Sequence, residues 1–267
     1  MAKPEPAATT GFPSSERFRL SNDATFQQPA MKFSRIYLNR LQGNPPPHDT
    51  VVVIDVLRSF TSAAIALSRG ASAIYPVESI AEAATLANRL DNTVSVGAIG
   101  GGDPVPGFDF GNSPSYLERA QLAGKTVVMS TAAGVRGLQR YHHQAKHVFA
   151  ASLVCARATA AAIRAAKARE ITFIITGEWV DRDGDEDIAC ADYLEALLLG
   201  ETPDPAAFMQ RVRDSDFGRR FTSGDWPNLP PADLDIAAQA DRFNFAMPVQ
   251  SDGEHLMIQP YPIRGAD

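Results

Sequence analysis

Short apolar runs alternate with longer segments of helical periodicity along most of the chain. The run at 51–56 is continuous and rich in β-branched residues, which is typical of a strand buried on both faces. Further strands are predicted at 33–38, 73–77, 93–96, 125–129, 147–150 and 171–176. Helices are predicted at 59–69, from Ser79 onward, and at 132–141, 152–168 and 187–199. This alternation predicts an α/β fold of three layers, α/β/α, with a mainly parallel or mixed sheet.

Local signals mark several of these boundaries. Ser79 precedes Glu82 by three residues, which is the pattern of a helix capping box. Gly70 and Gly200 stand where helices are expected to end. After residue 200 the pattern weakens. Helices are expected there at 205–213 and 232–240, and edge strands at 246–249 and 255–259.

Domain organisation follows from the same pattern. Residues 1–30 are rich in Pro, Ala, Ser, Thr and Gln and lack an apolar core, so we expect a disordered leader there. Residues 31–267 are predicted to form a single α/β domain. Residues 201–267 are expected to pack on its core as a flank.

Composition excludes several classes of function. The formal net charge is -6 and no basic stripe is present, so we expect no nucleic-acid partner. No apolar run approaches the ~20 residues of a membrane span, so we expect no membrane partner. Two cysteines give no disulfide framework, which favours a cytoplasmic location. The sequence leaves a homo-oligomer open.

Polar residues that follow the predicted strands are the candidates for chemistry, because ligands bind beyond the carboxyl ends of parallel strands. Asp55 lies in a strand expected to be buried, where an unpaired charge is costly. Arg58 precedes a helix, and a helix start beside a guanidinium suits phosphate or carboxylate. The alternatives are a structural Asp55–Arg58 pair or a helix N-cap.

Two loops add further candidates. The glycine-rich stretch 106–114 could cradle an anion with its N–H groups while Asp109 binds a metal or a hydroxyl. Ser113 there reads as an N-cap, and the alternative is a surface loop before a well-capped helix. Thr131 and Arg136 follow the strand at 125–129 and suit a phosphate contact, although an ST-turn explains them nearly as well.

An acidic stretch follows the last predicted strand of the alternating region. It contains Glu178 and five acids between 181 and 187, and such loops can hold Mg²⁺ through one or two carboxylates. A solvated turn before an acidic helix start is the competing interpretation. The triplet around Arg242 is by itself an ordinary surface feature. The phosphate-binding P-loop, dinucleotide-binding and nucleophile-elbow motifs are all absent from the sequence.

Taken in order, these pieces resemble the 2-phosphosulfolactate phosphatase family. The matching stretches are 52–58, 107–114 and 134–136, with looser matches at 151–152, 186–191 and 241–243. The resemblance implies a three-layer α/β fold, a Mg²⁺ requirement, and hydrolysis of the phosphate ester of a small phosphorylated acid, 2-phosphosulfolactate or a related one.

The resemblance also implies roles for individual residues. Asp55, Arg58, Asp109 and Glu178 are expected to be catalytic, and the first of these to hold metal together with Glu186 and Asp187. The residues expected to bind substrate are Asn112, Ser113, Thr131, Arg136 and Arg242.

The chain departs from the family pattern at two places. The family usually carries Gly-Glu-Arg where this chain has Ala98, Ile99 and Gly100, and its Asn-Gly turn begins here with Ala133. Loss of an acid and a phosphate-binding arginine would each remove several kcal/mol of transition-state stabilisation. A catalytically inactive homologue that binds an anionic metabolite is therefore the alternative to a Mg²⁺-dependent phosphatase.

Overall fold

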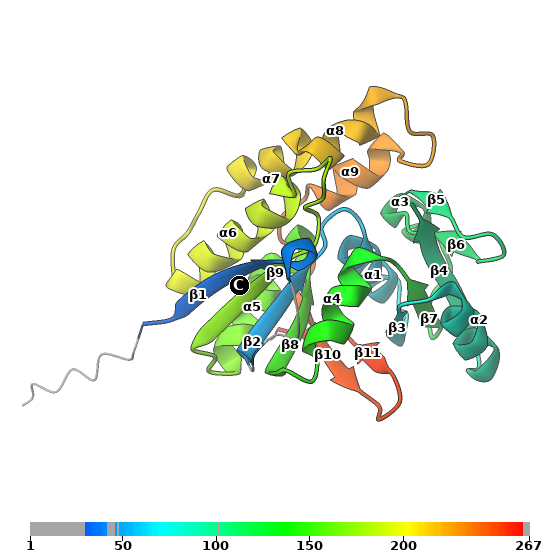
Figure 1. Ribbon diagram of the computed structural model, residues 1–267, viewed down its shortest axis with the longest axis horizontal. Coiled ribbons are helices and arrows are strands. Elements are labelled where there is room, and N and C mark those ends of the chain that lie inside the picture. The colour runs from blue at the N-terminus through cyan, green and yellow to red at the C-terminus, as the bar shows by residue number, and fades with distance from the viewer. Residues whose placement is uncertain (1–29, 42–45, 47, 101, 264–267) are drawn as a thin grey trace, which may run out of the picture. The chain divides into compact units, whose positions relative to one another are not determined.

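Strands and helices alternate along the described part of the chain, which in this computed structural model comprises residues 30–41, 46, 48–100 and 102–263 (Figure 1). The strands are β1 (Lys32–Tyr37), β2 (His48–Ile54), β3 (Ala73–Val77), β4 (Thr93–Ile99), β5 (Asp103–Pro104), β6 (Phe110–Gly111), β7 (Thr126–Ser130), β8 (Ala145–Ala151), β9 (Glu170–Ile175), β10 (Phe245–Ser251), β11 (Leu256–Ile258) and β12 (Tyr261–Pro262). The helices are α1 (Ser59–Ser68), α2 (Ile80–Arg89), α3 (Pro114–Leu117), α4 (Ala133–Tyr141), α5 (Ala156–Ala165), α6 (Asp185–Leu199), α7 (Pro205–Asp214), α8 (Asp216–Ser223) and α9 (Pro231–Ala237), with 3-10 turns η1 (Leu38–Arg40) and η2 (Leu153–Cys155).

The side chains of β2 explain the layers. Val51 and Val53 belong to an apolar cluster that contains residues of α1 and α4. Val52 and Ile54 belong to a second cluster that contains residues of α5 and α6. Because successive side chains of a strand point to opposite faces, these two clusters lie on opposite sides of the sheet. The predicted three-layer α/β/α fold is confirmed.

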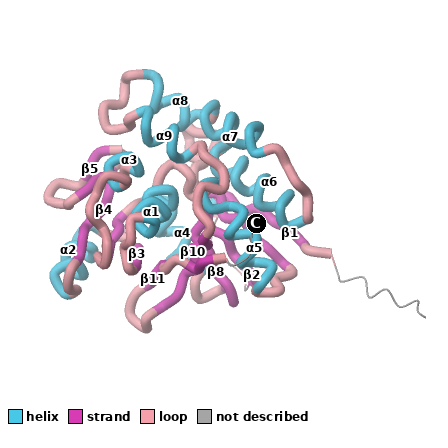
Figure 2. Tube along the Cα trace, turned by 180° about the vertical axis from the view of Figure 1, so that it is seen from behind, coloured by secondary structure: helices cyan, strands magenta, loops and turns pink. Residues whose placement is uncertain are grey.

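The sheet consists of two groups of parallel strands joined by an antiparallel hairpin. Its order is β1-β9-β2-β8-β10-β11-β3-β7-β4-β5. Strands β1, β9, β2 and β8 are parallel to one another, and so are β3, β7 and β4. The hairpin of β10 and β11 pairs antiparallel with β8 on one side and with β3 on the other. Figure 2 shows this hairpin from behind.

Two sequence predictions about elements need correction. The strands expected at the sheet edges, 246–249 and 255–259, lie in the middle of the sheet as β10 and β11. The helix expected at 152–168 is the 3-10 turn η2 followed by α5, which ends at Ala165. The predicted capping box is confirmed, because the N–H of Glu82 donates to Ser79 Oγ at 3.1 Å.

The segment after residue 200 covers the carboxyl ends of one group of strands. Helices α7, α8 and α9 follow α6, each contacts the next, and the four lie close together in both views (Figures 1 and 2). Val212, Phe217 and Leu234 from α7, α8 and α9 are buried in the same cluster as β2 and β9. This packing brings side chains of α8, and of the loop after it, to the strand ends.

Residues Met31–Asp267 group into one compact unit. The predicted leader falls almost entirely on residues 1–29, which lie outside the described residues, so it stays a prediction. Across the described residues, no helix combines the length and apolar character needed to cross a membrane. Cys155 and Cys190 are both free and buried.

Candidate active site

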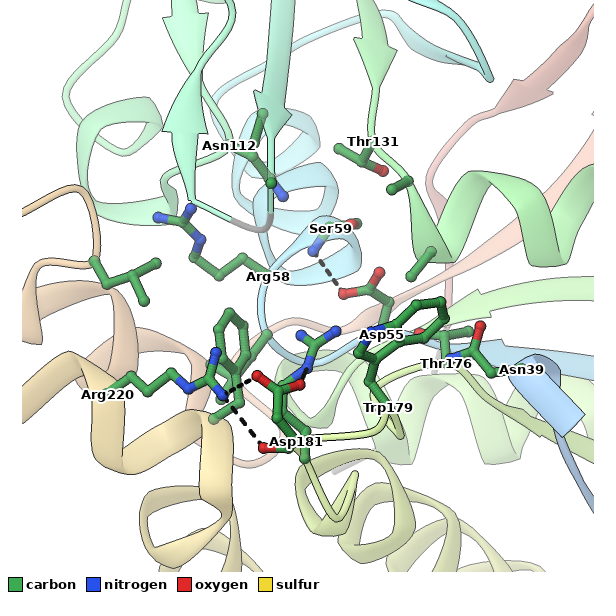
Figure 3. A pocket seen from close by; sticks show the side chains of 18 of the residues that line it. Asn39, Asp55, Arg58, Ser59, Asn112, Thr131, Thr176, Trp179, Asp181 and Arg220 are labelled. Atoms are coloured by element: carbon green, nitrogen blue, oxygen red, sulfur yellow. Dashed lines mark hydrogen bonds and ion pairs between the residues drawn. The ribbon is translucent and has the colours of Figure 1, made fainter. Parts of the chain in front are cut away.

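A pocket of about 600 Å³ opens at the carboxyl ends of the strands. Asp55, Thr131 and Thr176 line it, and each of them directly follows a strand: β2, β7 and β9, respectively. Figure 3 shows these residues around a common space. The pocket thus lies where a parallel sheet is expected to bind ligands.

Asp55 is buried at the meeting point of two helix starts. Its Oδ1 accepts the N–H of Ser59 at 2.9 Å, and its Oδ2 accepts the N–H of Gly134 at 3.0 Å. A Cβ at residue 134 would lie 2.8 Å from Asp55 Oδ2, so this close approach requires glycine. Burial raises the pKa of Asp55, while the N–H donors and the positive charge of Arg182 act in the opposite direction.

Arg58 lines the pocket, but it forms its ion pair with Asp233 and not with Asp55. Its Nη1 lies 2.8 Å from Asp233 Oδ2, and both side chains are buried. The same nitrogen also donates to the carbonyl oxygen of Asn228 at 3.1 Å. Arg58 is therefore part of a buried ion pair with α9 and does not pair with Asp55. The N-cap alternative survives in part, because Asp55 accepts the first N–H of α1.

Three buried polar atoms of the pocket residues have no hydrogen-bond partner. They are Arg58 Nε, Asn112 Oδ1 and Thr131 Oγ1. A buried polar atom without a partner costs about 1–3 kcal/mol, so native proteins rarely keep several together without a reason. A polar ligand in the pocket would supply the missing partners.

The pocket is cationic in an acidic protein. Four arginines line it, Arg58, Arg136, Arg182 and Arg220, against the two aspartates Asp55 and Asp181. Arg136 Nη2 donates to Asn39 Oδ1 at 2.6 Å, and Arg220 Nη2 donates to Asp181 Oδ2 at 2.6 Å. The chain as a whole has a net charge of -6. Because Arg58 is paired with Asp233 and Arg220 with Asp181, Arg136 and Arg182 remain against Asp55, and this smaller excess of guanidinium groups favours an anionic ligand.

Two more carboxyl groups lie close to Asp55 but are enclosed. Asp187 accepts the N–H groups of Val56 at 2.8 Å, Thr176 at 3.0 Å and Gly177 at 2.7 Å. Burial, followed by the charges of Glu186 and Asp55, raises the pKa of Asp187 well above its usual range. Burial also raises the pKa of Glu186, to about 7.

Of the three carboxyl groups expected to bind a metal ion, only Asp55 is available in the pocket. The oxygens of Asp187 are already taken up by N–H donors, and neither Asp187 nor Glu186 lines the pocket. The described residues include no cluster of three or more His, Cys, Asp or Glu placed to hold a metal. Asp55 fits a Mg²⁺ site, since Mg²⁺ needs only one or two carboxylates when substrate oxygens and water complete its shell.

Of the residues expected from the sequence, five line the pocket: Asp55, Arg58, Asn112, Thr131 and Arg136. Besides Glu186 and Asp187, four others lie elsewhere. Asp109 accepts the N–H of Ser95 at 2.8 Å, which chiefly lowers its pKa, and it lines a second hollow of about 550 Å³ with Tyr116. Ser113 donates to Asp233 at 2.7 Å.

Glu178 and Arg242 are the remaining two, and each is engaged by a side chain outside the pocket. Glu178 accepts from Arg40 Nε at 2.8 Å. Arg242 forms an ion pair with Glu118. The structure does not bring either residue to the pocket, so their expected roles stay predictions.

Several residues that line the pocket were not predicted from the sequence. Thr176 follows β9, so the rule of polar residues after strands could have found it. Trp179 and Arg182 form a tight turn in which each N–H donates to the other's carbonyl, at 3.0 and 3.2 Å. Arg220 and Trp226 come from the region after residue 200, and no sequence signal connected that region with the strand ends.

Comparison with known proteins agrees with this geometry. The family model described as 2-phosphosulpholactate phosphatase matches residues 38–221. A Bacillus subtilis protein named "Probable 2-phosphosulfolactate phosphatase" is 29% identical over 209 residues, which cover 78% of this chain and 90% of the relative. A Deinococcus radiodurans protein of the same name is 33% identical over 202 residues, covering 72% and 83%.

Other relatives align over a shorter stretch. A Caldicellulosiruptor saccharolyticus protein of that name is 38% identical over 156 residues, 57% of this chain and 64% of the relative. The alignment with a Thermus thermophilus relative also covers 64% of that protein. The family match includes β2 with Asp55, the loop with Asn112 and the turn with Arg182, and so most of the pocket. The chain belongs to the 2-phosphosulfolactate phosphatase family.

Proposed function

We propose that this protein is a phosphoric monoester hydrolase that acts on a small phosphorylated acid, such as 2-phosphosulfolactate or a related phospho-acid. The observation that carries the proposal is the pocket at the strand ends, where buried Asp55 faces a space lined by four arginines. The names of the relatives support the same reaction.

The chain's own groups suit binding of the phosphate. Arg58 Nε and Thr131 Oγ1 are unpartnered and can donate to phosphate oxygens. The first turns of α1 and α4 begin at the pocket, and helix N-termini favour anions. Arg136, Arg182 and Arg220 offset the charge that develops on the transferred phosphoryl group.

We assign to Asp55 the role of orienting the attacking water and acting as its general base. Each of its oxygens accepts one N–H, which fixes the carboxylate and leaves lone pairs free to accept a hydrogen bond from water. A water held there is oriented for in-line attack on phosphorus, and the raised pKa of Asp55 brings it nearer to that of an effective base.

We further propose that Mg²⁺ is required and that Asp55 would hold it. When bound, Mg²⁺ would neutralise phosphate charge and lower the pKa of a nearby water. Glu186 and Asp187 would then influence this site through their charge rather than as ligands. The cytoplasmic location and the absence of nucleic-acid partners stay predictions.

The test is release of inorganic phosphate from 2-phosphosulfolactate and from the phosphate ester of lactate, with Mg²⁺ and with EDTA. We expect turnover with Mg²⁺, loss in EDTA, and recovery when Mg²⁺ is added back. Asp55→Asn should lower kcat by about 100-fold or more, in line with loss of a catalytic acid or base.

The matched control is Asp91→Asn, the same chemical change at an exposed residue that does not line the pocket. It should keep the wild-type rate. Phosphate release that persists unchanged in Asp55→Asn would remove this pocket from the reaction. A folded protein that binds phosphate in calorimetry but never releases it from an ester would be the inactive homologue instead.

A further inference from the structure

The pocket is larger than a three-carbon phospho-acid needs. Its volume of about 600 Å³ lies within the range of about 300–1,000 Å³ that is typical of sites for drug-sized molecules. Gly100, on its wall, leaves further room, because a Cβ there would meet nothing within 4 Å. The space beyond the phosphate position therefore suits a bulkier part of the substrate.

The outer part of the pocket is aromatic. Trp179 and Trp226 line it and remain 50% and 45% exposed, whereas Asp55 is buried at its inner end. The two tryptophans come from separate segments, the turn after β9 and the loop between α8 and α9. Single exposed apolar side chains are ordinary on protein surfaces, but two large exposed rings that line the same pocket suggest a ligand.

Guanidinium groups lie over Trp226 and over Phe217, which also lines the pocket. The Arg220 guanidinium carbon lies 5.0 Å from the centroid of the Trp226 ring and 5.6 Å from that of Phe217. The Arg182 guanidinium carbon lies 4.8 Å from the Phe217 ring. Figure 3 shows Trp179 and Arg220 on opposite sides of Asp181. Flat groups thus line the pocket from two sides, an arrangement that favours a flat ligand by stacking.

We propose that the substrate is a phosphate monoester whose carbon portion carries a flat aromatic or heteroaromatic ring. The ring lies against Trp179 and Trp226 at the outer end while the phosphate lies at Asp55. This inference rests on the proposed function and narrows its substrate class to related phospho-acids that carry such a ring, which 2-phosphosulfolactate does not.

Three esters that share one reacting centre test it: the phosphate monoesters of lactate, 3-phenyllactate and 3-cyclohexyllactate. They have the same acid and the same ester oxygen, so they differ only in the group that would reach the tryptophans. We expect kcat/KM for the phenyl ester to exceed that for the lactate ester by about tenfold, the gain of a good aromatic contact. The cyclohexyl ester should gain less.

Variants locate the effect. Trp179→Ala and Trp226→Ala should each lower the phenyl-to-lactate ratio of kcat/KM towards one, whereas Trp179→Phe and Trp226→Phe should preserve most of it. Tyr261→Ala, at an exposed aromatic residue that does not line the pocket, is the matched control and should keep the full ratio. Circular dichroism and the thermal midpoint establish that each variant is folded.

The outcomes separate the two proposals. Absence of phosphate release from all three esters by the folded protein overturns the proposed function and this inference together. Release with equal efficiency from all three, or a gain for cyclohexyl equal to that for phenyl, overturns the inference alone. A ratio that is unchanged in both Trp→Ala variants does the same.

Discussion

Glu186 is a buried carboxyl group, 1% exposed, and neither of its oxygens has a hydrogen-bond partner. Burial is the largest cause that raises its pKa, from 4.5 to about 7. Between these two values the folded protein keeps Glu186 protonated while the unfolded chain releases the proton. The contribution of neutral Glu186 to the free energy of unfolding is therefore fully present below about pH 4.5 and is lost as the pH rises through about 7.

Glu186→Gln removes this titration without changing the shape of the side chain. We expect the variant to be more stable than the wild type by roughly 3–4 kcal/mol at pH 8, since each pKa unit between 4.5 and about 7 is worth about 1.4 kcal/mol. The difference should vanish at pH 4.5. Urea unfolding in EDTA across this pH range measures it.

The control for this prediction is Glu201→Gln, the same change at an exposed residue just after α6. It should leave the pH dependence of stability as in the wild type. If Glu186→Gln shows no advantage at pH 8, folding does not raise the pKa of Glu186, and a cation or water partners the ionised carboxylate in the folded protein.

At the residue scale, the sequence predicted the groups that follow strands and could not predict their partners. Asp55 and Thr131 were found because a polar residue directly after a buried strand points to a ligand site. Arg58 was recognised, but its partner Asp233 comes from a distant helix that no local pattern connects to it. Asp109, in the glycine-rich loop, was expected to be catalytic like Asp55, but it accepts the N–H of Ser95 and lines a different hollow.

At the scale of elements, the Arg58–Asp233 ion pair joins α1 to α9. Asp233 also accepts from Ser113 Oγ at 2.7 Å and from the N–H of Ser115 at 2.9 Å, so it fixes the start of α3 as well. Three elements thus meet at one buried carboxylate, on the side of the pocket that Arg58 and Asn112 line. The ion pair therefore fixes the relative positions of α1, α3 and α9 at the pocket, in addition to any role of Arg58 in binding.

Arg58→Met and Asp233→Leu should each lower the free energy of unfolding by about 3–5 kcal/mol, because each leaves a buried charge without its partner. The double variant should lose less than the sum. Urea denaturation of all four proteins gives this coupling directly. A double variant that loses the full sum would show that the two side chains do not interact.

An exposed pair supplies the comparison for that cycle. Arg89 Nη1 lies 2.9 Å from Glu254 Oε1, and both side chains are more than half exposed. Arg89→Met and Glu254→Leu should each change stability by about 1 kcal/mol or less. Because both are arginine–carboxylate pairs, the difference between the two sets of variants measures the effect of burial on the stability that an ion pair provides.

Element prediction succeeded where periodicity is strong and failed where elements are short. Apart from β5 and β6, the strands and helices between 51 and 199 were expected close to where they lie. Helix α8 and strands β5 and β6 were missed, because a helix of eight residues or a strand of two carries too few periodic positions to detect.

At the scale of the whole described unit, the sheet depends on β10 and β11. Ile258 of β11 is fully buried and pairs with Ile74 of β3, and Met247 of β10 pairs with Ala150 of β8. The sequence could predict that these segments are extended. It could not predict that they lie at the centre, because pairing between distant strands leaves no mark in local periodicity.

Ile258→Ala should therefore destabilise the protein strongly. We expect a loss of about 2–5 kcal/mol in the free energy of unfolding, the range for truncating a buried isoleucine to alanine. Ile80→Ala, at a partly exposed position on α2, should cost much less. Urea unfolding measures both losses. Equal losses of free energy of unfolding in the two variants would show that the β10–β11 hairpin does not contribute specially to the stability of the sheet.

The position of this hairpin has a consequence for synthesis of the protein. Translation proceeds from the N-terminus, so β3 and β8 leave the ribosome well before the two strands that will separate them. Until then the nascent chain carries open strand edges, which are prone to pair with other chains. Cells that make this protein in quantity are therefore expected to need a chaperone that shields those edges until the last strands emerge.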